Sequence, residues 1–280
     1  MPAPFISIIL PTRNVARVLP RCLESIAAQT FRDFEVVVVD GASTDGTLEI
    51  LKAKGANVGY LVSEPDRGVY HARNKALVHA RGEWVCFMGA DDWFWAPDVL
   101  EKLVPYLRTA LPRHRVVYSR LRMIDPQGRL VEEVGEPWER AKAGFFSFGL
   151  IPHPGLMHHR TLFEAHGNFD ERFTCSGDCE LLLRELKSAD ALFAPVLTVG
   201  MEFGGESTRP ENFLRVMRET EEALRRHGYA PPRLRWTYWK ACSWLYIRVH
   251  ALVGDRVARR LADLYRLLSL RKPRFSGHRD

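Results

Sequence analysis

The chain alternates between short apolar runs and segments that carry apolar residues at helical spacing. The runs are FISIILPT, FEVVVVD, VGYLVS and WVCFMGADD, at residues 5–12, 34–40, 58–63 and 84–92. Continuous β-branched runs predict strands that are buried on both faces, as in parallel sheets covered by helices. The segments 15–29, 47–55 and 71–82 are predicted helices. This order predicts right-handed β–α–β units and an α/β fold with a doubly wound sheet.

Each predicted strand ends in polar residues. These ends are PTRN at 11–14, Asp40, the segment 64–68 with Glu64, Asp66 and Arg67, and the pair Asp91 and Asp92. In open α/β sheets, ligands bind at the carboxyl edge of the strands. Asp40 alone could simply start a turn, with Ser43 or Thr44 capping the next helix. The polar ends of the other strands favour a ligand site.

The residues at these ends suit a nucleoside diphosphate. An acid can accept hydrogen bonds from a base or a ribose, and paired carboxylates suit a hard divalent cation. The sequence has neither a GxGxxG motif nor a GxxxxGK[ST] motif. Because a glycine-rich phosphate loop is missing, a metal ion is the expected counterion for the diphosphate.

Four segments in order resemble the successive blocks of the family 2 inverting glycosyltransferases. They are SIILPTRN, VVVVDGASTDGT, SEPDRGVYHARNKAL and WVCFMGADDWFWAPDVL, and the resemblance spans roughly residues 5–208. It implies the GT-A fold, a Rossmann-like, mostly parallel central sheet flanked by helices. It also implies that Pro11, Thr12 and Asn14 line the nucleotide, that Asp40 holds the base, and that Asp66 and Arg73 lie over the nucleotide pocket.

By the same resemblance, Asp91 and Asp92 bind the donor sugar and a metal ion, Mn²⁺ or Mg²⁺. Many family members have Asp where this chain has Gly89. The metal would therefore rest on Asp91 and Asp92 together with phosphate oxygens and water.

Residues 151–186 resemble the acceptor side of the same family, in which a strand with His, a G-x-F-D turn and an acid at the head of a helix follow one another. The resemblance implies that Asp178 is the catalytic base, although many members have Glu-Asp where this chain has Gly177-Asp178. Asp178 or Ser176 could also cap the helix, and Glu180 is the substitute base.

Histidines and glycines nearby have more than one interpretation. His153 could touch the diphosphate or the acceptor, or only pack in its loop, whereas His158 and His159 are expected to be structural. The segment FGGES at 203–207 resembles a small loop that closes on the phosphates, but a double glycine is equally consistent with a mobile loop.

Charge divides the chain near residues 205–235. Residues 1–208 carry 23 Lys and Arg against 27 Asp and Glu, whereas residues 209–280 carry 17 against 7. We expect a catalytic domain at 1–208, with a nucleotide-sugar half at 1–100 and an acceptor half at 101–208. Residues 209–280 would form a basic, aromatic-rich helical extension.

The extension interleaves aromatic and basic residues, namely Trp236, Tyr238, Trp239, Trp244 and Tyr246 with Arg235, Lys240 and Arg248. This pattern suits the headgroup region of an anionic bilayer. A helix packed on the catalytic domain, with buried Trp and solvated Arg, explains it equally well. No nucleic-acid motif accompanies the pattern, so a nucleic acid is not an expected partner.

No run of about 18 apolar residues is present, and Pro11 interrupts the first apolar stretch. Five scattered cysteines are typical of reduced thiols, and Cys175 and Cys179 have no second close pair for zinc. We therefore expect a cytoplasmic protein, placed peripherally on the inner face of the cytoplasmic membrane.

These features favour a metal-dependent inverting glycosyltransferase of the hexosyltransferase type, as in bacterial cell-surface polysaccharide synthesis. It would move a sugar from a nucleotide-diphosphate sugar, with a UDP-sugar favoured, to a glycan or lipid-linked acceptor. One alternative is a noncatalytic nucleotide-sugar-binding or scaffold module, against which Asp91, Asp92 and Asp178 argue. Another is a sugar nucleotidyltransferase, but PTRNVARVLPR lacks the glycines of its activating loop.

Overall fold

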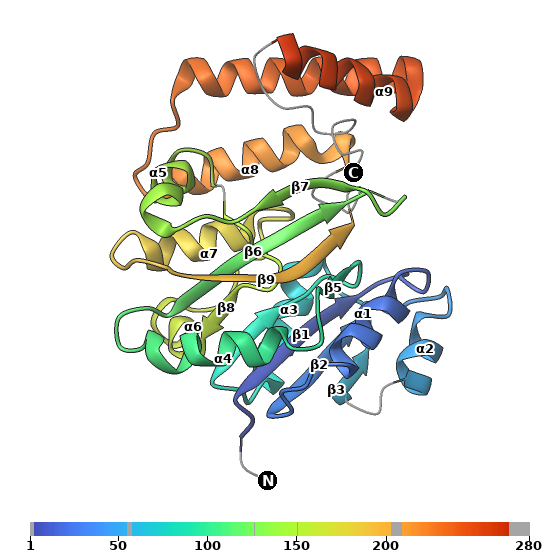
Figure 1. The fold of residues 1–280 in the computed structure, drawn as a ribbon, viewed down its shortest axis with the longest axis vertical. Helices are drawn as coiled ribbons and strands as arrows, with labels where there is room; N and C mark the ends of the chain where they lie inside the picture. Colours follow the sequence, from blue (N-terminus) through green and yellow to red (C-terminus); the bar gives the residue numbers. More distant parts are fainter. Residues whose placement is uncertain (1–2, 55–57, 126, 150, 203–208, 269–280) are drawn as a thin grey trace.

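The computed structural model describes residues 3–54, 58–125, 127–149, 151–202 and 209–268 (Figure 1). One sheet runs through the molecule in the order β3-β2-β1-β4-β8-β6-β9-β5, and β7 pairs with β6. Most neighbouring strands in the first half are parallel, and helices lie on both faces. The predicted α/β fold with a mostly parallel sheet is confirmed.

The first half of the sheet follows the apolar pattern of the sequence. Its elements are β1 (Ile6–Thr12), α1 (Leu19–Ala27), β2 (Phe34–Asp40), α2 (Thr47–Lys54), β3 (Val58–Ser63), α3 (Val69–His79) and β4 (Trp84–Phe87). Alternate residues of β2 point to opposite faces, since Val36 and Val38 belong to one core and Val37 and Val39 to the other. The continuous valine run therefore reflects burial on both sides.

Two predicted boundaries differ from the structure. The helix predicted from residue 15 begins at Leu19, because residues 14–16 form a turn whose N–H groups bond to the loop after β2. The strand predicted at 84–92 divides into β4 and β5 (Asp92–Phe94). A turn separates them, closed by the Asp92 N–H donating to the Gly89 carbonyl.

The second half of the sheet contains antiparallel strands. Its elements are α4 (Val99–Ala110), β6 (Val116–Ile124), β7 (Leu130–Val134), α5 (Trp138–Phe148), β8 (Met157–His159), α6 (Arg160–His166), α7 (Gly177–Leu186) and β9 (Leu192–Glu202). β8 lies antiparallel between β4 and β6, and β5 lies antiparallel to β9. Because β6 and β9 are parallel to each other and run in the direction of β4, their carboxyl ends meet the same edge as those of β1, β2 and β4.

After residue 208 the chain continues with η1 (Pro210–Asn212), α8 (Phe213–Arg226) and α9 (Arg233–Leu268). Gly254, at φ 74°, interrupts the helical geometry of α9, so α9 consists of two helical segments. α8 lies beside α5 and α7, and α9 covers α8 on the side away from the sheet (Figure 1). Within the described residues, no helix is both long enough and apolar enough to cross a bilayer.

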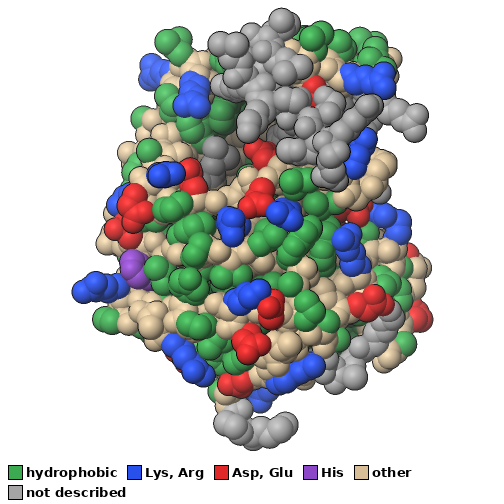
Figure 2. Space-filling model, in the orientation of Figure 1, with side chains coloured by type: hydrophobic (Ala, Val, Ile, Leu, Met, Phe, Trp, Pro, Cys, Tyr) green, Lys and Arg blue, Asp and Glu red, His purple; other side chains and the backbone are tan. Residues whose placement is uncertain are grey.

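One side of α9 is packed and the other is exposed. Trp236 is 4% exposed and stacks on Phe148, with ring centroids 5.7 Å apart. Large apolar side chains on the other side are exposed, including Leu234, Tyr238, Trp244, Leu245 and Leu252. Hydrophobic and basic side chains lie side by side in Figure 2 at the end of the molecule where Figure 1 shows α9. Packing on the catalytic domain therefore accounts for one side of the helix, and membrane binding by the other side stays a prediction.

Candidate active site

The ends of β1 and β2 form one wall of the candidate site. Thr12 pairs in register with Asp40, and both side chains are buried. The Asp40 carboxylate accepts hydrogen bonds from the Thr12 hydroxyl at 3.0 Å, the Ser63 hydroxyl at 2.6 Å, and both the hydroxyl and the N–H of Ser43. Burial opposes ionisation, but these hydrogen bonds outweigh it and lower the pKa of Asp40 below its usual value. A ligand donor would reach this carboxylate by displacing one of the hydroxyls.

The loops after β1 and β2 interlock next to this acid. Asn14 adopts φ 51°, a conformation that asparagine tolerates, and its side-chain oxygen accepts the N–H of Thr44 at 2.9 Å. Pro11 precedes this turn within β1, opposite Val39. Asp66 lies in the segment that follows β3, and a Cβ atom at Gly41 would overlap its carboxylate. The predicted nucleoside residues therefore lie together at adjoining strand ends.

Two adjacent acids follow β4. Asp92 is buried, and its Oδ2 accepts the N–H of Gly89 at 2.9 Å. Its Oδ1 is buried and has no hydrogen-bond partner among the described residues. Burial, followed by the charge of Asp91, raises the pKa of Asp92 well above its usual value, and burial also raises the pKa of Asp91.

An unpartnered carboxylate oxygen beside a second acid fits a divalent cation, because the cation would relieve both the desolvation and the repulsion. Within the described part of the chain, no three His, Cys, Asp or Glu side chains cluster as metal ligands. Asp91 and Asp92 would thus supply two oxygens, and donor and water would supply the rest. Gly89 leaves room for the two carboxylates, since a Cβ atom at this position would lie 2.6 Å from Asp91 Oδ1 and 2.8 Å from Asp92 Oδ2.

Asp178 occupies the first turn of α7 and is half-buried. Its Oδ1 accepts the N–H of Cys179 at 2.8 Å and the hydroxyl of Tyr70 at 3.3 Å, while His153 Nδ1 lies 3.4 Å from Oδ2. Burial and the positive charge of Arg73 hold the pKa of His153 well below its usual value, so this ring is neutral at pH 7. Burial, together with the charge of Asp178, raises the pKa of Tyr70, so its hydroxyl keeps its proton and donates.

Gly177, at the position where the family resemblance led us to expect Glu before Asp178, has a steric explanation. The ring of Tyr70 packs on Gly177, and a Cβ atom there would lie 2.9 Å from two of the ring carbons. Tyr70 thus occupies the space that a side chain at position 177 would need. Its hydroxyl then reaches the neighbouring carboxylate of Asp178.

Arg73 links the paired acids to Asp178 and its neighbours. Its guanidinium carbon lies 5.2 to 5.6 Å from the ring centroids of Tyr70, Phe87 and Phe169. Its charge acts on Asp92, on His153 and on Tyr70. Its Nε is buried without a hydrogen-bond partner among the described residues. The charge of Arg73 therefore acts on members of both groups of predicted site residues.

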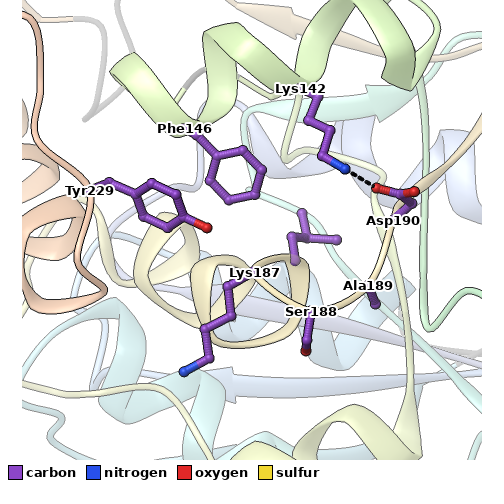
Figure 3. A pocket seen from close by; sticks show the side chains of 8 residues that line it. Lys142, Phe146, Lys187, Ser188, Ala189, Asp190 and Tyr229 are labelled. Carbon is purple, nitrogen blue, oxygen red and sulfur yellow. Dashed lines mark hydrogen bonds and ion pairs between the residues drawn. The ribbon is translucent and has the colours of Figure 1, made fainter.

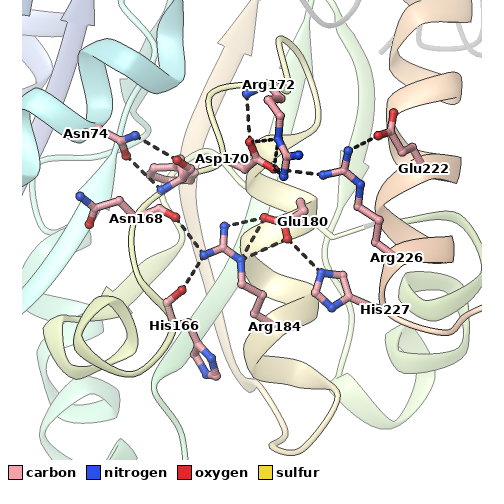
Figure 4. A network of polar contacts seen from close by, with 11 residues as sticks. Asn74, His166, Asn168, Asp170, Arg172, Glu180, Arg184, Glu222, Arg226 and His227 are labelled. Carbon is pink, nitrogen blue, oxygen red and sulfur yellow. Dashed lines mark hydrogen bonds and ion pairs between the residues drawn. The ribbon is translucent and has the colours of Figure 1, made fainter.

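Glu180, the substitute base, belongs to a structural network (Figure 4). Its carboxylate accepts from Arg184 Nη2 at 2.5 Å and contacts His227 Nε2 at 2.9 Å. Arg184 in turn donates to the carbonyls of His166 and Asn168. A buried carboxylate held by two partners is poorly placed to receive a substrate proton, so the geometry favours Asp178.

A pocket of about 450 Å³ lies at the other end of α7, lined by Leu186, Lys187, Ser188, Phe146 and Tyr229 among others (Figure 3). Lys142 bridges to Asp190 at 2.6 Å on its rim. None of the predicted site residues lines it. The pocket lies at the C-terminal end of α7, whereas Asp178 and the strand carboxyl ends lie at its N-terminal end. We therefore assign the candidate site to the carboxyl edge of the sheet and not to this pocket.

Sequence reasoning missed three kinds of residue. Ser43 and Ser63 hold Asp40, Tyr70 contacts Asp178, and Glu202 at the end of β9 adds negative charge beside Asp91. Ser43 and Tyr70 lie inside segments already singled out, but only the packing shows where their side chains point. His158 is fully buried and His159 largely so, consistent with structural roles. The segment 203–207 lies outside the described residues.

Known proteins resemble this chain in sequence. Residues 7–154 match the family model described as glycosyl transferase family 2. A PGL/p-HBAD biosynthesis glycosyltransferase of Mycobacterium tuberculosis is 36% identical over 187 residues, which is 66% of this chain and 70% of that protein. Chondroitin synthase of Escherichia coli is 28% identical over 244 residues, covering 81% of this chain but only 34% of the synthase.

Solved structures share the fold. A mannosyltransferase of Pyrobaculum calidifontis, in complex with GDP-Man and Mn²⁺, superposes with a TM-score of 0.64 at 24% identity, over 97% of this chain and 82% of that one. Residues 1–349 of S. aureus TarS, in complex with UDP-GlcNAc, give a TM-score of 0.60 at 22% identity. The match covers 78% of this chain and 66% of the TarS fragment. The family model spans more than half of the chain, and this chain therefore belongs to glycosyl transferase family 2, with the GT-A fold.

Proposed function

We propose that the protein is a metal-dependent, inverting glycosyltransferase that uses a nucleotide-diphosphate sugar. The observation that carries this proposal is that one cation, Arg73, acts both on Asp92 of the desolvated pair Asp91 and Asp92 and on Tyr70 and His153, the two residues that contact the half-buried carboxylate of Asp178. Inverting transfer needs these two elements, a proton acceptor and a centre that attracts a leaving diphosphate.

Asp178 is the proposed general base. It takes the proton of the acceptor hydroxyl as that oxygen forms a bond to C1 of the donor sugar. The bond from C1 to the phosphate oxygen breaks, and its electron pair leaves with the nucleoside diphosphate. Because the acceptor attacks from the face opposite the leaving group, the configuration at C1 inverts. Tyr70 donates to one carboxylate oxygen at 3.3 Å and neutral His153 lies 3.4 Å from the other, so both oxygens keep lone pairs for the acceptor proton.

Asp91 and Asp92 are the proposed ligands of Mn²⁺ or Mg²⁺. When bound, the cation would supply positive charge for the departing diphosphate. Asp91 would also contact the donor sugar. Support comes from the unpartnered Asp92 Oδ1 and from the Mn²⁺ named with the Pyrobaculum mannosyltransferase.

The nucleoside would lie on the β1 to β3 strand ends. We propose that Pro11, Thr12 and Asn14 line it, that Asp40 accepts a base N–H, and that Asp66 closes the pocket over Gly41. A UDP-sugar is our favoured donor, and hexosyl transfer is the favoured reaction. The neighbouring structures are named with UDP-GlcNAc and GDP-Man, which supports a nucleotide sugar but leaves both bases to be tested.

We further propose that the acceptor is a glycan or a lipid-linked glycan. The catalytic domain (residues 1–208) would work at an anionic membrane face on the cytoplasmic side. The relatives named for chondroitin synthesis and PGL/p-HBAD biosynthesis support such acceptors. The extension 209–280 would bind the membrane through the exposed apolar side of α9 and its basic residues.

Donor screening tests the proposal. Thermal shift with UDP-, GDP- and dTDP-sugars should show stabilisation by one nucleotide class in Mn²⁺ and none in EDTA. Release of the nucleoside diphosphate, and inverted product configuration by NMR, should follow with a saccharide acceptor. If donor binds with Mn²⁺ but no acceptor or water ever releases the diphosphate, the noncatalytic module is the better description. Stabilisation that is equal in EDTA would refute metal dependence.

A further inference from the structure

A carboxylate on α8 accepts hydrogen bonds from the backbone just before the proposed base. Glu219 is 8% exposed, and its Oε2 accepts three consecutive backbone N–H groups, from Thr174 at 2.9 Å, Cys175 at 2.7 Å and Ser176 at 3.0 Å. Its Oε1 accepts the hydroxyl of Thr174 at 2.5 Å. One buried side chain therefore holds the three residues that lead into Gly177 and Asp178.

The start of α7 depends on α8 for a second reason. Ser176 is the N-cap residue of α7, but its hydroxyl makes no capping bond. That hydroxyl instead bonds to the Val216 carbonyl at 3.2 Å and lies 3.0 Å from the Thr220 hydroxyl, and both partners are on α8. The three N–H groups of residues 174–176 and the hydroxyls of Thr174 and Ser176 thus all bond to residues of α8.

The side chain of Asp178 is only loosely held by its neighbours from other elements. Tyr70 donates at 3.3 Å, and His153 lies at 3.4 Å, near the long limit for a hydrogen bond. The position of the carboxylate is therefore set mainly by the backbone from which it extends. Small displacements of a reacting group lower the rate sharply, because transfer needs close alignment of the reacting atoms.

We propose that Glu219 is a positioning residue for the base, which it serves by fixing residues 174–176 and through them the first turn of α7. This inference rests on the proposed role of Asp178. It makes α8, which lies beyond residue 208, a requirement for transfer at full rate. Glu219 itself touches neither donor nor acceptor in this proposal.

Three variants test the inference in the full chain. Glu219→Ala removes all four hydrogen bonds. Glu219→Gln keeps a carbonyl oxygen that can accept the same three N–H groups without the negative charge. Glu221→Ala is the matched control, since Glu221 is a mostly buried carboxylate on the same helix, but it contacts Lys240 and Trp236 of α9.

The kinetic readout is Mn²⁺-dependent release of the nucleoside diphosphate from the nucleotide sugar that the parent turns over. We expect Glu219→Ala to lower kcat roughly tenfold or more, with the donor KM changed less than about twofold. Glu219→Gln should recover most of the lost kcat, and Glu221→Ala should keep the parent kcat. A purely structural role would lower the melting temperature of Glu219→Ala while the folded protein kept the parent kcat.

A second readout does not depend on turnover. Hydrogen–deuterium exchange of the amides of residues 174–176 should accelerate in Glu219→Ala, stay slow in Glu219→Gln, and stay slow in Glu221→Ala. Faster exchange with an unchanged kcat would overturn the link to the base, and so would equal losses of kcat in the Ala and Gln variants. A parent that turns over no nucleotide sugar while the exchange pattern holds would sink the proposed function instead. If Glu219→Ala does not fold, Thr174→Val, which removes only the hydroxyl contact, should give a smaller fall in kcat, and an unchanged value would count against the proposal.

Discussion

Among single residues, Asp178 and Glu180 stand two positions apart on α7 and have opposite surroundings. Asp178 is half-buried, and its neighbours from other elements lie at long distance, whereas Glu180 is buried against Arg184 and His227. A carboxylate that must receive a proton needs a free lone pair and access to the acceptor. This contrast is the reason why we propose Asp178, and not Glu180, as the base.

Asp178→Asn should separate binding from turnover. The amide keeps the shape and can still accept the Cys179 N–H, but it cannot take a proton at neutral pH. Donor affinity measured by calorimetry should match the parent, while turnover should fall roughly 10²-fold or more. Glu180→Gln serves as the comparison, with a lower melting temperature and nearly full turnover of the folded fraction. Parent-like turnover in Asp178→Asn would move the base elsewhere.

Asp92→Asn tests the metal assignment. Asparagine keeps an oxygen to accept the Gly89 N–H, so the turn after β4 should persist. One carboxylate is lost from the proposed metal ligands, and we expect Mn²⁺-dependent donor binding to disappear while the melting temperature without metal stays near that of the parent. Calorimetric titration with donor, in Mn²⁺ and in EDTA, measures this directly. An unchanged metal requirement in the variant would show that Asp92 is not a ligand.

At the scale of elements, polar contacts join the α6–α7 loop to α8. Asp170 accepts from Arg172 at 2.7 Å and from Arg226 of α8 at 3.0 Å (Figure 4). The hydrogen bonds from Arg172, with the charge of both arginines, lower the pKa of Asp170 from 3.8 to about 2. The ionised form is thus favoured by the folded state.

Acid should remove this contribution. Because the pKa of Asp170 is lower in the folded state, its stabilisation is present above pH 4 and is lost as the pH falls from about 4 to about 2. Asp170→Asn should therefore lower the free energy of unfolding at pH 7, by roughly 1 kcal/mol once solvent screening of the exposed Arg172 is considered. Urea unfolding of parent and variant at several pH values measures the difference. A gap that stays constant down to pH 2.5 would contradict the assignment.

At the scale of the whole molecule, α9 presents two different sides. The packed side holds Trp236 on Phe148, and Lys240 and Trp236 bond to Glu221 of α8. The exposed side carries large apolar side chains, and α9 belongs to the extension 209–280, which has a net charge of +10. Basic and apolar groups together are what an interfacial helix uses on an anionic bilayer.

Vesicle sedimentation tests this side of the molecule. The parent should sediment with vesicles that contain anionic lipid, and added salt should weaken binding only in part, because apolar burial is not screened. Replacing Tyr238, Trp244 and Leu245 with Ser should release the protein from the vesicles without changing the melting temperature. Trp236→Ala should do the reverse, keeping vesicle binding but losing roughly 3 kcal/mol or more of stability. A parent that does not sediment at low salt would refute membrane binding.

Much of the architecture could be predicted from local pattern. The valine run at 36–39 predicts a buried strand, because burial on both faces selects continuous apolar residues. The polar residues that follow each strand predict the edge of the sheet at which turns and ligands are found. The residues predicted to bind the nucleoside, Thr12, Asn14, Asp40 and Asp66, lie at neighbouring strand ends for that reason. Their binding roles stay predictions.

What the sequence by itself determined was the α/β order of the first half, the polar edge of the sheet and the family resemblance. The tertiary structure alone decided that β5 pairs with β9 and that Tyr70 packs on Gly177, more than 100 residues away. It also decided that Glu219 accepts hydrogen bonds from the loop before Asp178. Local periodicity records which face of an element is buried, but it does not record which distant element covers that face. Contacts between remote segments exist only once the helices and strands have packed, and the proposed placement of the base is built from such contacts.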